Sequence, residues 1–76
     1  MKDLLEFLAK SLVDHPDQVV VIETGDEESV HLNLQVAPED MGKVIGKQGK
    51  IAKSIRTMVK ARAAKEGKKI IVDIGS

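Results

Sequence analysis

The sequence predicts one small α+β domain, a two-layer sandwich in which three helices cover a three-stranded mixed sheet. Three observations support this fold class: apolar residues recur at helical spacing near the N-terminus and after residue 50, two short β-branched segments follow one another, and a third such segment ends the chain. A chain of 76 residues has the size of a single domain. All elements therefore have to share one thin core.

The first helix is expected over residues 2–14. Its apolar positions recur at the spacing of one helix face and are Leu4, Leu5, Leu8 and Leu12. Phe7 stands at the edge of this stripe and is expected in the core. Pro16 limits the helix, because the residue before a proline is pushed out of the helical region.

Two strands joined by a short loop should form a β-hairpin. Residues 18–24, QVVVIET, are short and β-branched, as strands are. Residues 25–29, GDEES, are typical of a turn or loop. In residues 30–36, VHLNLQV, apolar and polar residues alternate, which predicts a strand with one covered face and one solvated face.

A short helix is expected over residues 37–46. Pro38 suits its first position, and Gly46 suits its end. The carboxylates of Glu39 and Asp40 lie in the first turn, where they should remain solvated and pair with the positive end of the helix dipole.

Residues 50–66 predict a longer helix. Its expected buried stripe is Ile51, Ile55, Met58 and Val59. Residues 68–74, KKIIVDI, predict a last strand with Ile70, Val72 and Ile74 inward. The element order is α-β-β-α-α-β. A helical crossover separates the last two strands, so if these strands are neighbours they should be parallel.

Composition excludes several classes of protein. The chain has no cysteine, which excludes disulfides, thiolate zinc sites and cysteine nucleophiles. No apolar run approaches the roughly 20 residues that span a bilayer, and the acidic residues of MKDLLEFLAK do not fit a signal peptide. We therefore expect a cytoplasmic protein without a membrane partner.

The net charge of zero hides a strong asymmetry. Residues 1–42 contain two basic and ten acidic residues, a net −8, and residues 43–76 contain ten basic and two acidic residues, a net +8. Such a division gives one surface that can attract polyanions while the whole molecule stays neutral. A merely solvated surface has the same composition, so charge alone leaves polyanion binding open.

The segment Gly46-Lys47-Gln48-Gly49 is the most informative motif. A P-loop needs four residues between its glycines and then Lys-Ser or Lys-Thr, and a dinucleotide fingerprint needs an additional glycine, so neither matches. A plain turn between helices is one remaining interpretation, since glycine is common at positive φ. The other is an open backbone clamp for an anion, because the start of the next helix offers free N–H groups.

Residues 44–56, VIGKQGKIAKSIR, resemble the signature of the KH domain, which is an apolar pair, then G-x-x-G, then a helix. The predicted element order resembles the type II KH arrangement, and the similarity extends over essentially the whole chain. The chain resembles in particular the small standalone bacterial KH proteins of the KhpA type. The general pattern has an isoleucine three residues after the second glycine; Ala52 takes that place here, and Ile55 matches the next.

The resemblance implies a non-catalytic protein that binds single-stranded RNA and needs no cofactor. A KH loop clamps the backbone of about four single-stranded nucleotides. By position, Gly46 and Gly49 would let the phosphates approach, while Lys47 and Gln48 would contact them. The adjacent groove for the bases would be lined by Ile45, Ala52 and Ile55.

Basic residues near the loop are further candidates for RNA contacts. Lys43 and Lys50 bracket it in the sequence. At about 100° per residue, Lys53, Arg56 and Lys60 share one flank of the long helix and could extend a phosphate path. An ordinary solvated flank is the alternative.

The resemblance also implies a post-transcriptional regulator or RNA chaperone, either as a homodimer or in complex with a larger KH protein of the KhpB type. The alternative hypothesis is a protein–protein interaction module, an adaptor for a second KH protein. With one Phe and no Tyr or Trp, the chain has no aromatic platform for stacking bases. His15 and His31 show no metal-ligand spacing, so no metal site is expected.

Overall fold

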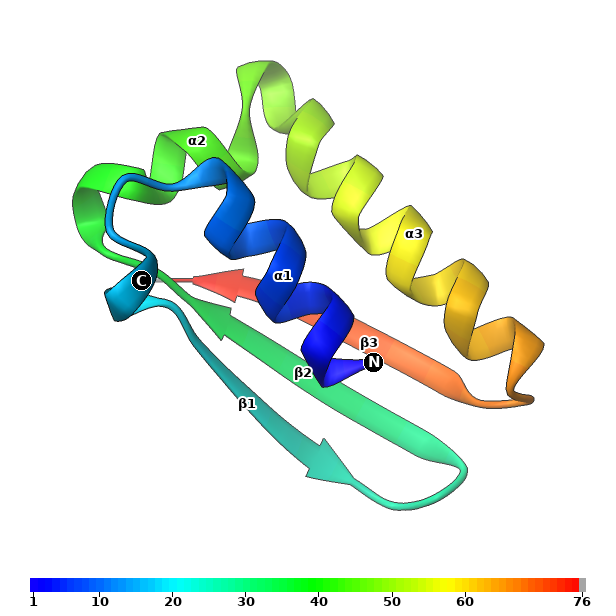
Figure 1. Ribbon diagram of the computed structural model, residues 1–76. Coiled ribbons are helices and arrows are strands. Elements are labelled where there is room, and N and C mark those ends of the chain that lie inside the picture. Colours follow the sequence, from blue (N-terminus) through cyan, green and yellow to red (C-terminus); the bar gives the residue numbers. More distant parts are fainter. Residues whose placement is uncertain (76) are drawn as a thin grey trace.

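The computed structural model describes residues 1–75 and confirms the predicted order of elements (Figure 1). The helices and strands are α1 (Lys2–Leu12), β1 (Val20–Gly25), β2 (Ser29–Gln35), α2 (Met41–Ile45), α3 (Lys50–Lys65) and β3 (Lys69–Gly75). Short 3₁₀ turns at Pro16–Gln18, Pro38–Asp40 and Lys47–Gly49 connect them. Among the helices of residues 1–75, none combines the length and apolar character that a bilayer crossing requires.

The sheet has the strand order β1-β2-β3. β1 and β2 are antiparallel, with Val20 opposite Gln35, and they form the predicted hairpin. β3 returns through α2 and α3 and pairs in parallel with β2, with Ser29 opposite Lys69. The expected mixed sheet is therefore confirmed, and β3 is the edge strand that lies nearest to α3.

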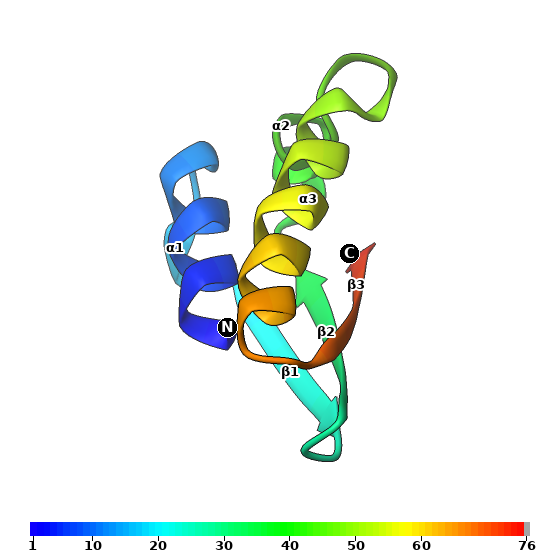
Figure 2. The ribbon, with the colours of Figure 1, turned by 90° about the vertical axis from the view of Figure 1, so that its right-hand side faces the viewer.

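All three helices lie on one face of the sheet, and the other face is open (Figures 1 and 2). Alternation in β2 decides which side chains meet the helices: Val30, Leu32 and Leu34 are buried, whereas His31 and Asn33 face the open side and stay partly exposed. The largest fully buried apolar side chains are Leu5, Leu32, Leu34, Val44 and Val59. The predicted two-layer α+β sandwich is confirmed.

Phe7 and Met58, which were expected in the core, lie outside it. Phe7 is 67% exposed and Met58 is 50% exposed. The buried face of α1 is centred on Leu5 and Ala9, and at about 100° per residue Phe7 lies on the opposite side of the helix. The first helix also ends at Leu12, before the expected Asp14.

Candidate nucleic-acid interface

The Gly46–Gly49 loop joins α2 to α3 in a backbone conformation that few residues adopt. The Gly46 N–H donates to the Gly42 carbonyl at 2.9 Å and closes the last turn of α2. Gly46 then takes φ 72° and ψ −177°, a region that is essentially restricted to glycine. Gln48, at φ 56°, and Gly49, at φ 75°, are left-handed as well. Because three of the four loop residues have positive φ, the chain changes direction sharply between α2 and α3 and does not continue as one helix.

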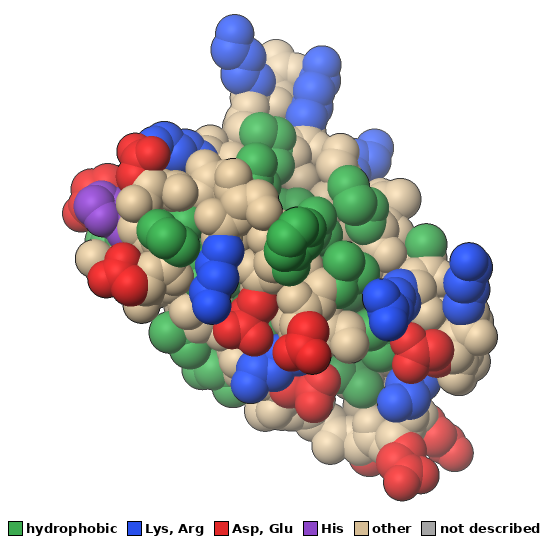
Figure 3. Space-filling model, in the orientation of Figure 1, with side chains coloured by type: hydrophobic (Ala, Val, Ile, Leu, Met, Phe, Trp, Pro, Cys, Tyr) green, Lys and Arg blue, Asp and Glu red, His purple; other side chains and the backbone are tan. Residues whose placement is uncertain are grey.

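The loop is open to solvent on its outer side. The side chains of Lys47 and Gln48 are exposed, and a Cβ atom added to Gly49 would meet nothing within 4 Å. Figure 3 shows Lys and Arg side chains standing out at this end of the molecule, while acidic side chains gather at the β1–β2 turn at the other end. A large anion therefore has steric access to the loop backbone.

The inner side of the loop is filled by Ile51. A Cβ atom on Gly46 would lie 2.5 Å from Ile51 Cγ1, which is too close for any real contact. Ile51 packs against the hydrophobic core. The usual KH pattern has an isoleucine one residue later in the sequence, at the position of Ala52. Ala52, which takes the place of that isoleucine, is buried and 4% exposed.

The start of α3 offers groups that attract an anion. No side chain caps the helix at Gly49, and no acidic residue lies in its first turn. The Lys50 N–H donates to the Lys47 carbonyl of the preceding turn. The helix dipole adds a partial positive charge at this end of α3. Lys50 and Lys53 are exposed at the same end.

Arg56 lies between α3 and the edge of the sheet. Its Nε–H donates to the Val72 carbonyl of β3 at 3.2 Å, and the side chain is half-buried. Lys53 and Lys60 lie on the same flank of α3 and are exposed. The flank predicted from helical periodicity therefore faces β3, but its arginine contacts protein backbone rather than open solvent.

The apolar residues predicted to line the groove are unequally accessible. Ile45 is 36% exposed at the end of α2. Ala52 and Ile55 are 4% and 2% exposed, because their side chains point into the core between α3 and the sheet. Of these three residues, Ile45 is the one that offers a substantial apolar surface next to the loop.

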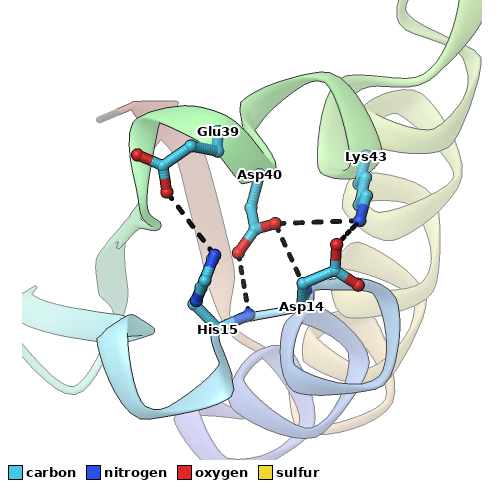
Figure 4. A network of polar contacts seen from close by, with 5 residues as sticks. All are labelled: Asp14, His15, Glu39, Asp40 and Lys43. Carbon is cyan, nitrogen blue, oxygen red and sulfur yellow. Dashed lines mark hydrogen bonds and ion pairs between the residues drawn. The ribbon is translucent and has the colours of Figure 1, made fainter.

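Lys43 stands apart from the other lysines near the loop because it is paired. Its ammonium contacts the Asp14 carboxylate and lies 4.0 Å from Asp40 Oδ1 (Figure 4). The Lys43 hydrogen bond holds the pKa of Asp14 below its usual value, and the Asp14 hydrogen bond raises the pKa of Lys43. Lys43 thus points toward the segment after α1.

Asp40 is a residue whose role the sequence did not reveal. It was expected to be solvated near a helix start, yet it is 1% exposed. Its carboxylate accepts hydrogen bonds from the backbone N–H groups of Asp14 at 3.2 Å and His15 at 3.0 Å (Figure 4). The expectation was wrong because these partners come from 25 and 26 residues away, a contact that no local pattern encodes.

The histidines are engaged in pairs. His15 Nε2 lies 3.6 Å from Glu39 Oε2, and His31 Nε2 lies 2.6 Å from Asp73 Oδ2 on the open face of the sheet. Within residues 1–75, no group of three or more His, Asp or Glu side chains is arranged to hold a metal ion.

Comparison with known proteins places this geometry in a family. A model of the KH domain of KhpA and KhpB matches residues 2–74. The RNA-binding protein KhpA of Clostridium acetobutylicum is 65% identical over 74 residues, which cover 97% of this chain and 99% of that protein. KhpA of Clostridium perfringens is also 65% identical with the same coverage, and KhpA of Aquifex aeolicus is 46% identical, covering 97% of this chain and 94% of its own length.

The fold agrees with this assignment. A three-stranded mixed sheet under three helices, with a G-x-x-G loop between α2 and α3, is the type II KH arrangement. The family is non-catalytic, so the chain is not an enzyme. The chain belongs to the KhpA/KhpB family of KH-domain proteins.

Proposed function

We propose that this protein binds short segments of single-stranded RNA through the Gly46–Gly49 loop and the groove beside it. The observation that carries the proposal is the loop itself, an exposed reversal with positive φ at Gly46, Gln48 and Gly49 at the start of a helix that has no acidic first turn. The names of its relatives as RNA-binding proteins favour RNA as the polyanion.

The phosphates would be held at the outer side of the loop. Gly49 has open space around the position of a Cβ atom, so a phosphate can approach the N-terminal end of α3. The exposed amine of Lys47 and amide of Gln48 would contact neighbouring phosphate oxygens. Lys50 and Lys53 add positive charge at the same helix end.

The bases would lie between α3 and β3, next to Ile45 and Arg56. Aliphatic contact and hydrogen bonding must hold them, since the only aromatic residue of the chain is Phe7 on the outer surface of α1. Base–aromatic stacking contributes about 1–3 kcal/mol per base where it exists. Its absence predicts modest affinity and a short, degenerate sequence preference, as suits a post-transcriptional regulator or RNA chaperone in the cytoplasm.

The test replaces the two exposed loop residues by acids. Lys47→Asp with Gln48→Asp should abolish binding of single-stranded RNA while the circular dichroism spectrum stays unchanged. A matched control, Ala64→Asp with Lys65→Asp, makes the same change in net charge about 20 Å along α3. That distance exceeds the Debye length of about 10 Å at 0.1 M salt, so the control should bind RNA nearly as wild type does.

Salt dependence gives an independent measurement of the same interface. With two to four phosphates contacted, the slope of log K against log salt should be about −1.5 to −3, since single strands give roughly −0.7 per phosphate. RNA binding that survives the double acid substitution, or that ignores salt, would show that the loop is not the clamp.

A second candidate function is self-association, or assembly with a larger KH protein of the KhpB type. The observation that favours it is the exposure of Phe7 and Met58 on the outer surface of α1 and α3, which lie side by side (Figures 1 and 2). Hydrophobic side chains also gather over these helices in Figure 3. Such patches are typical of protein–protein contacts. Sedimentation of wild type should reveal a dimer that Phe7→Glu with Met58→Glu converts to monomer.

A further inference from the structure

Lys43 differs from its basic neighbours in having its charge already compensated. Within residues 1–75, Lys47, Lys50 and Lys53 form no ion pair, whereas Lys43 contacts the Asp14 carboxylate and lies 4.0 Å from that of Asp40. Lys43 nevertheless occupies the last turn of α2, three residues before Gly46. It is close enough in the chain to serve an RNA phosphate at the loop, but it is turned toward two acids.

We propose that Asp14 is an internal competitor of RNA for Lys43 and thereby limits the affinity of the loop for phosphate. This inference rests on the proposed RNA-binding function and adds to it a residue that lies outside the KH signature. A phosphate that contacts Lys43 must therefore share the ammonium with the Asp14 carboxylate, against the repulsion of that acid, or displace it.

The segment that carries Asp14 is held in place, which makes it an effective competitor. Both the Asp14 and His15 backbone N–H groups donate to the buried Asp40 carboxylate, at 3.2 and 3.0 Å. Asp40 belongs to the turn that leads directly into α2. The carboxylate of Asp14 is therefore fixed beside Lys43 without an additional loss of backbone freedom, whereas a flexible RNA strand loses conformational freedom to reach the same amine.

Electrostatics support the same conclusion. The pKa of Asp14 lies below its usual value and that of Lys43 lies above, each chiefly because of the hydrogen bond to the other, so both remain charged near neutral pH. An ammonium beside a carboxylate presents a nearly neutral pair to a third charge. Removal of the Asp14 charge should thus free the Lys43 ammonium from its nearest acid and leave only the Asp40 carboxylate, at 4.0 Å, beside it.

The experiment compares Asp14→Asn with Asp17→Asn. Asp17 is an exposed acid three residues further along that forms no ion pair in residues 1–75, so its substitution changes net charge equally without freeing Lys43. Binding is measured by fluorescence anisotropy at low salt with a labelled oligouridylate of about 12 nucleotides, which exceeds the roughly four that a KH loop holds.

Asp14→Asn should bind about 3-fold more tightly than Asp17→Asn, as one exposed charge contact allows. Its salt slope should be steeper by about 0.7, the contribution of one additional phosphate on a single strand. In the background of Lys43→Gln, the same Asp14→Asn change should give no more gain than Asp17→Asn does. Circular dichroism of each variant should match wild type.

Three results would overturn the inference in distinguishable ways. Equal RNA affinities of Asp14→Asn and Asp17→Asn would show that any gain in affinity comes from the change in net charge and not from the release of Lys43. A gain that persists with Lys43→Gln would show that Asp14 acts on another group. If wild type itself fails to bind the oligouridylate and a mixed-sequence RNA, the proposed function falls together with this inference; if wild type binds through Lys47 and Gln48, only the competition by Asp14 is at issue.

Discussion

Replacement of the loop glycines by alanine provides a quantitative test of the loop geometry. Gly46→Ala combines two penalties. A residue with a side chain is forced to φ 72° and ψ −177°, which costs about 1–3 kcal/mol. The new Cβ also lies 2.5 Å from Ile51 Cγ1 and 2.8 Å from Ile51 Cβ, so the backbone itself must shift, at about 1–3 kcal/mol for an overpacked site. Together the two penalties span about 2–6 kcal/mol, and we expect a total loss near the middle of this range, about 4 kcal/mol.

Two other glycines serve as matched controls for the same substitution. Gly49 has φ 75° and ψ 13° with open space around it, so Gly49→Ala should cost only the left-handed backbone penalty of about 1–2 kcal/mol. Gly42 lies inside α2 without positive φ and without a neighbour within 4 Å, so Gly42→Ala should stabilise the protein by about 0.5–1 kcal/mol.

Urea unfolding followed by far-UV circular dichroism measures these free energies. A domain of this size has a total stability of only about 4–11 kcal/mol, at 0.05–0.15 kcal/mol per residue. At about 4–8 °C per kcal/mol, a loss of about 4 kcal/mol in Gly46→Ala should lower the Tm by about 16–32 °C. The double variant Gly46→Ala with Ile51→Ala should lose less than the sum of the single losses, since the contact with Cγ1 is then absent and only the contact with the Cβ of residue 51 remains. Equal losses for Gly46→Ala and Gly49→Ala would refute the assigned loop conformation.

Three further predictions concern the polar contacts. Asp40→Ala should lower the free energy of unfolding in urea by about 2–4 kcal/mol, because two part-buried backbone N–H groups lose a charged acceptor. The control Asp17→Ala, at an exposed position, should change it by no more than about 0.5 kcal/mol. A loss below about 1 kcal/mol for Asp40→Ala would contradict the role of the buried carboxylate. Arg56→Gln should change the ratio of affinities for different homopolymeric RNAs, since its guanidinium lies where the bases would pass, and an unchanged ratio would place the bases elsewhere. In the folded protein the pKa of Asp14 is lowered from 3.8 and that of Lys43 is raised from 10.5. The contribution of this ion pair to stability is therefore fully present between pH 3.8 and pH 10.5. It is lost as the pH falls through the lowered pKa of Asp14 or rises through the raised pKa of Lys43. The ratio of RNA affinities between Asp14→Asn and wild type should therefore be constant from about pH 5.5 to pH 8.5, and a ratio that changes within this range would assign the effect to another titrating group.

Local pattern in the sequence was sufficient for the element order and for most of the core. Alternation in residues 30–36 predicted that Leu32 and Leu34 face the helices, because successive side chains of a strand point to opposite sides. The turn at Gly46 and the start of the next helix were also predicted. The parallel pairing of β3 with β2 followed from the crossover between them.

Helix orientation was predicted less well than helix position. The stripe of leucines in α1 was wide enough for several choices of buried face, and Phe7 was assigned to the wrong one. Met58 was misplaced for a similar reason: it borders the buried Ile55 and Val59 in the helical projection but faces outward. Hydrophobicity says that a side chain favours burial, whereas the packing of α1 and α3 on the sheet decides how much surface can be buried.

The sequence by itself determined that a basic glycine loop stands between two helices and that the family is the KH family, because both depend on contiguous residues whose conformations are set locally. The tertiary structure alone decided which of the basic residues are free. Lys43 is paired with a residue 29 positions away, and Arg56 is turned to the edge of a strand 16 positions away. Such contacts arise only when the layers pack. Every lysine and arginine carries the same formal charge in the sequence, but the fold decides which of these charges has a neighbouring partner.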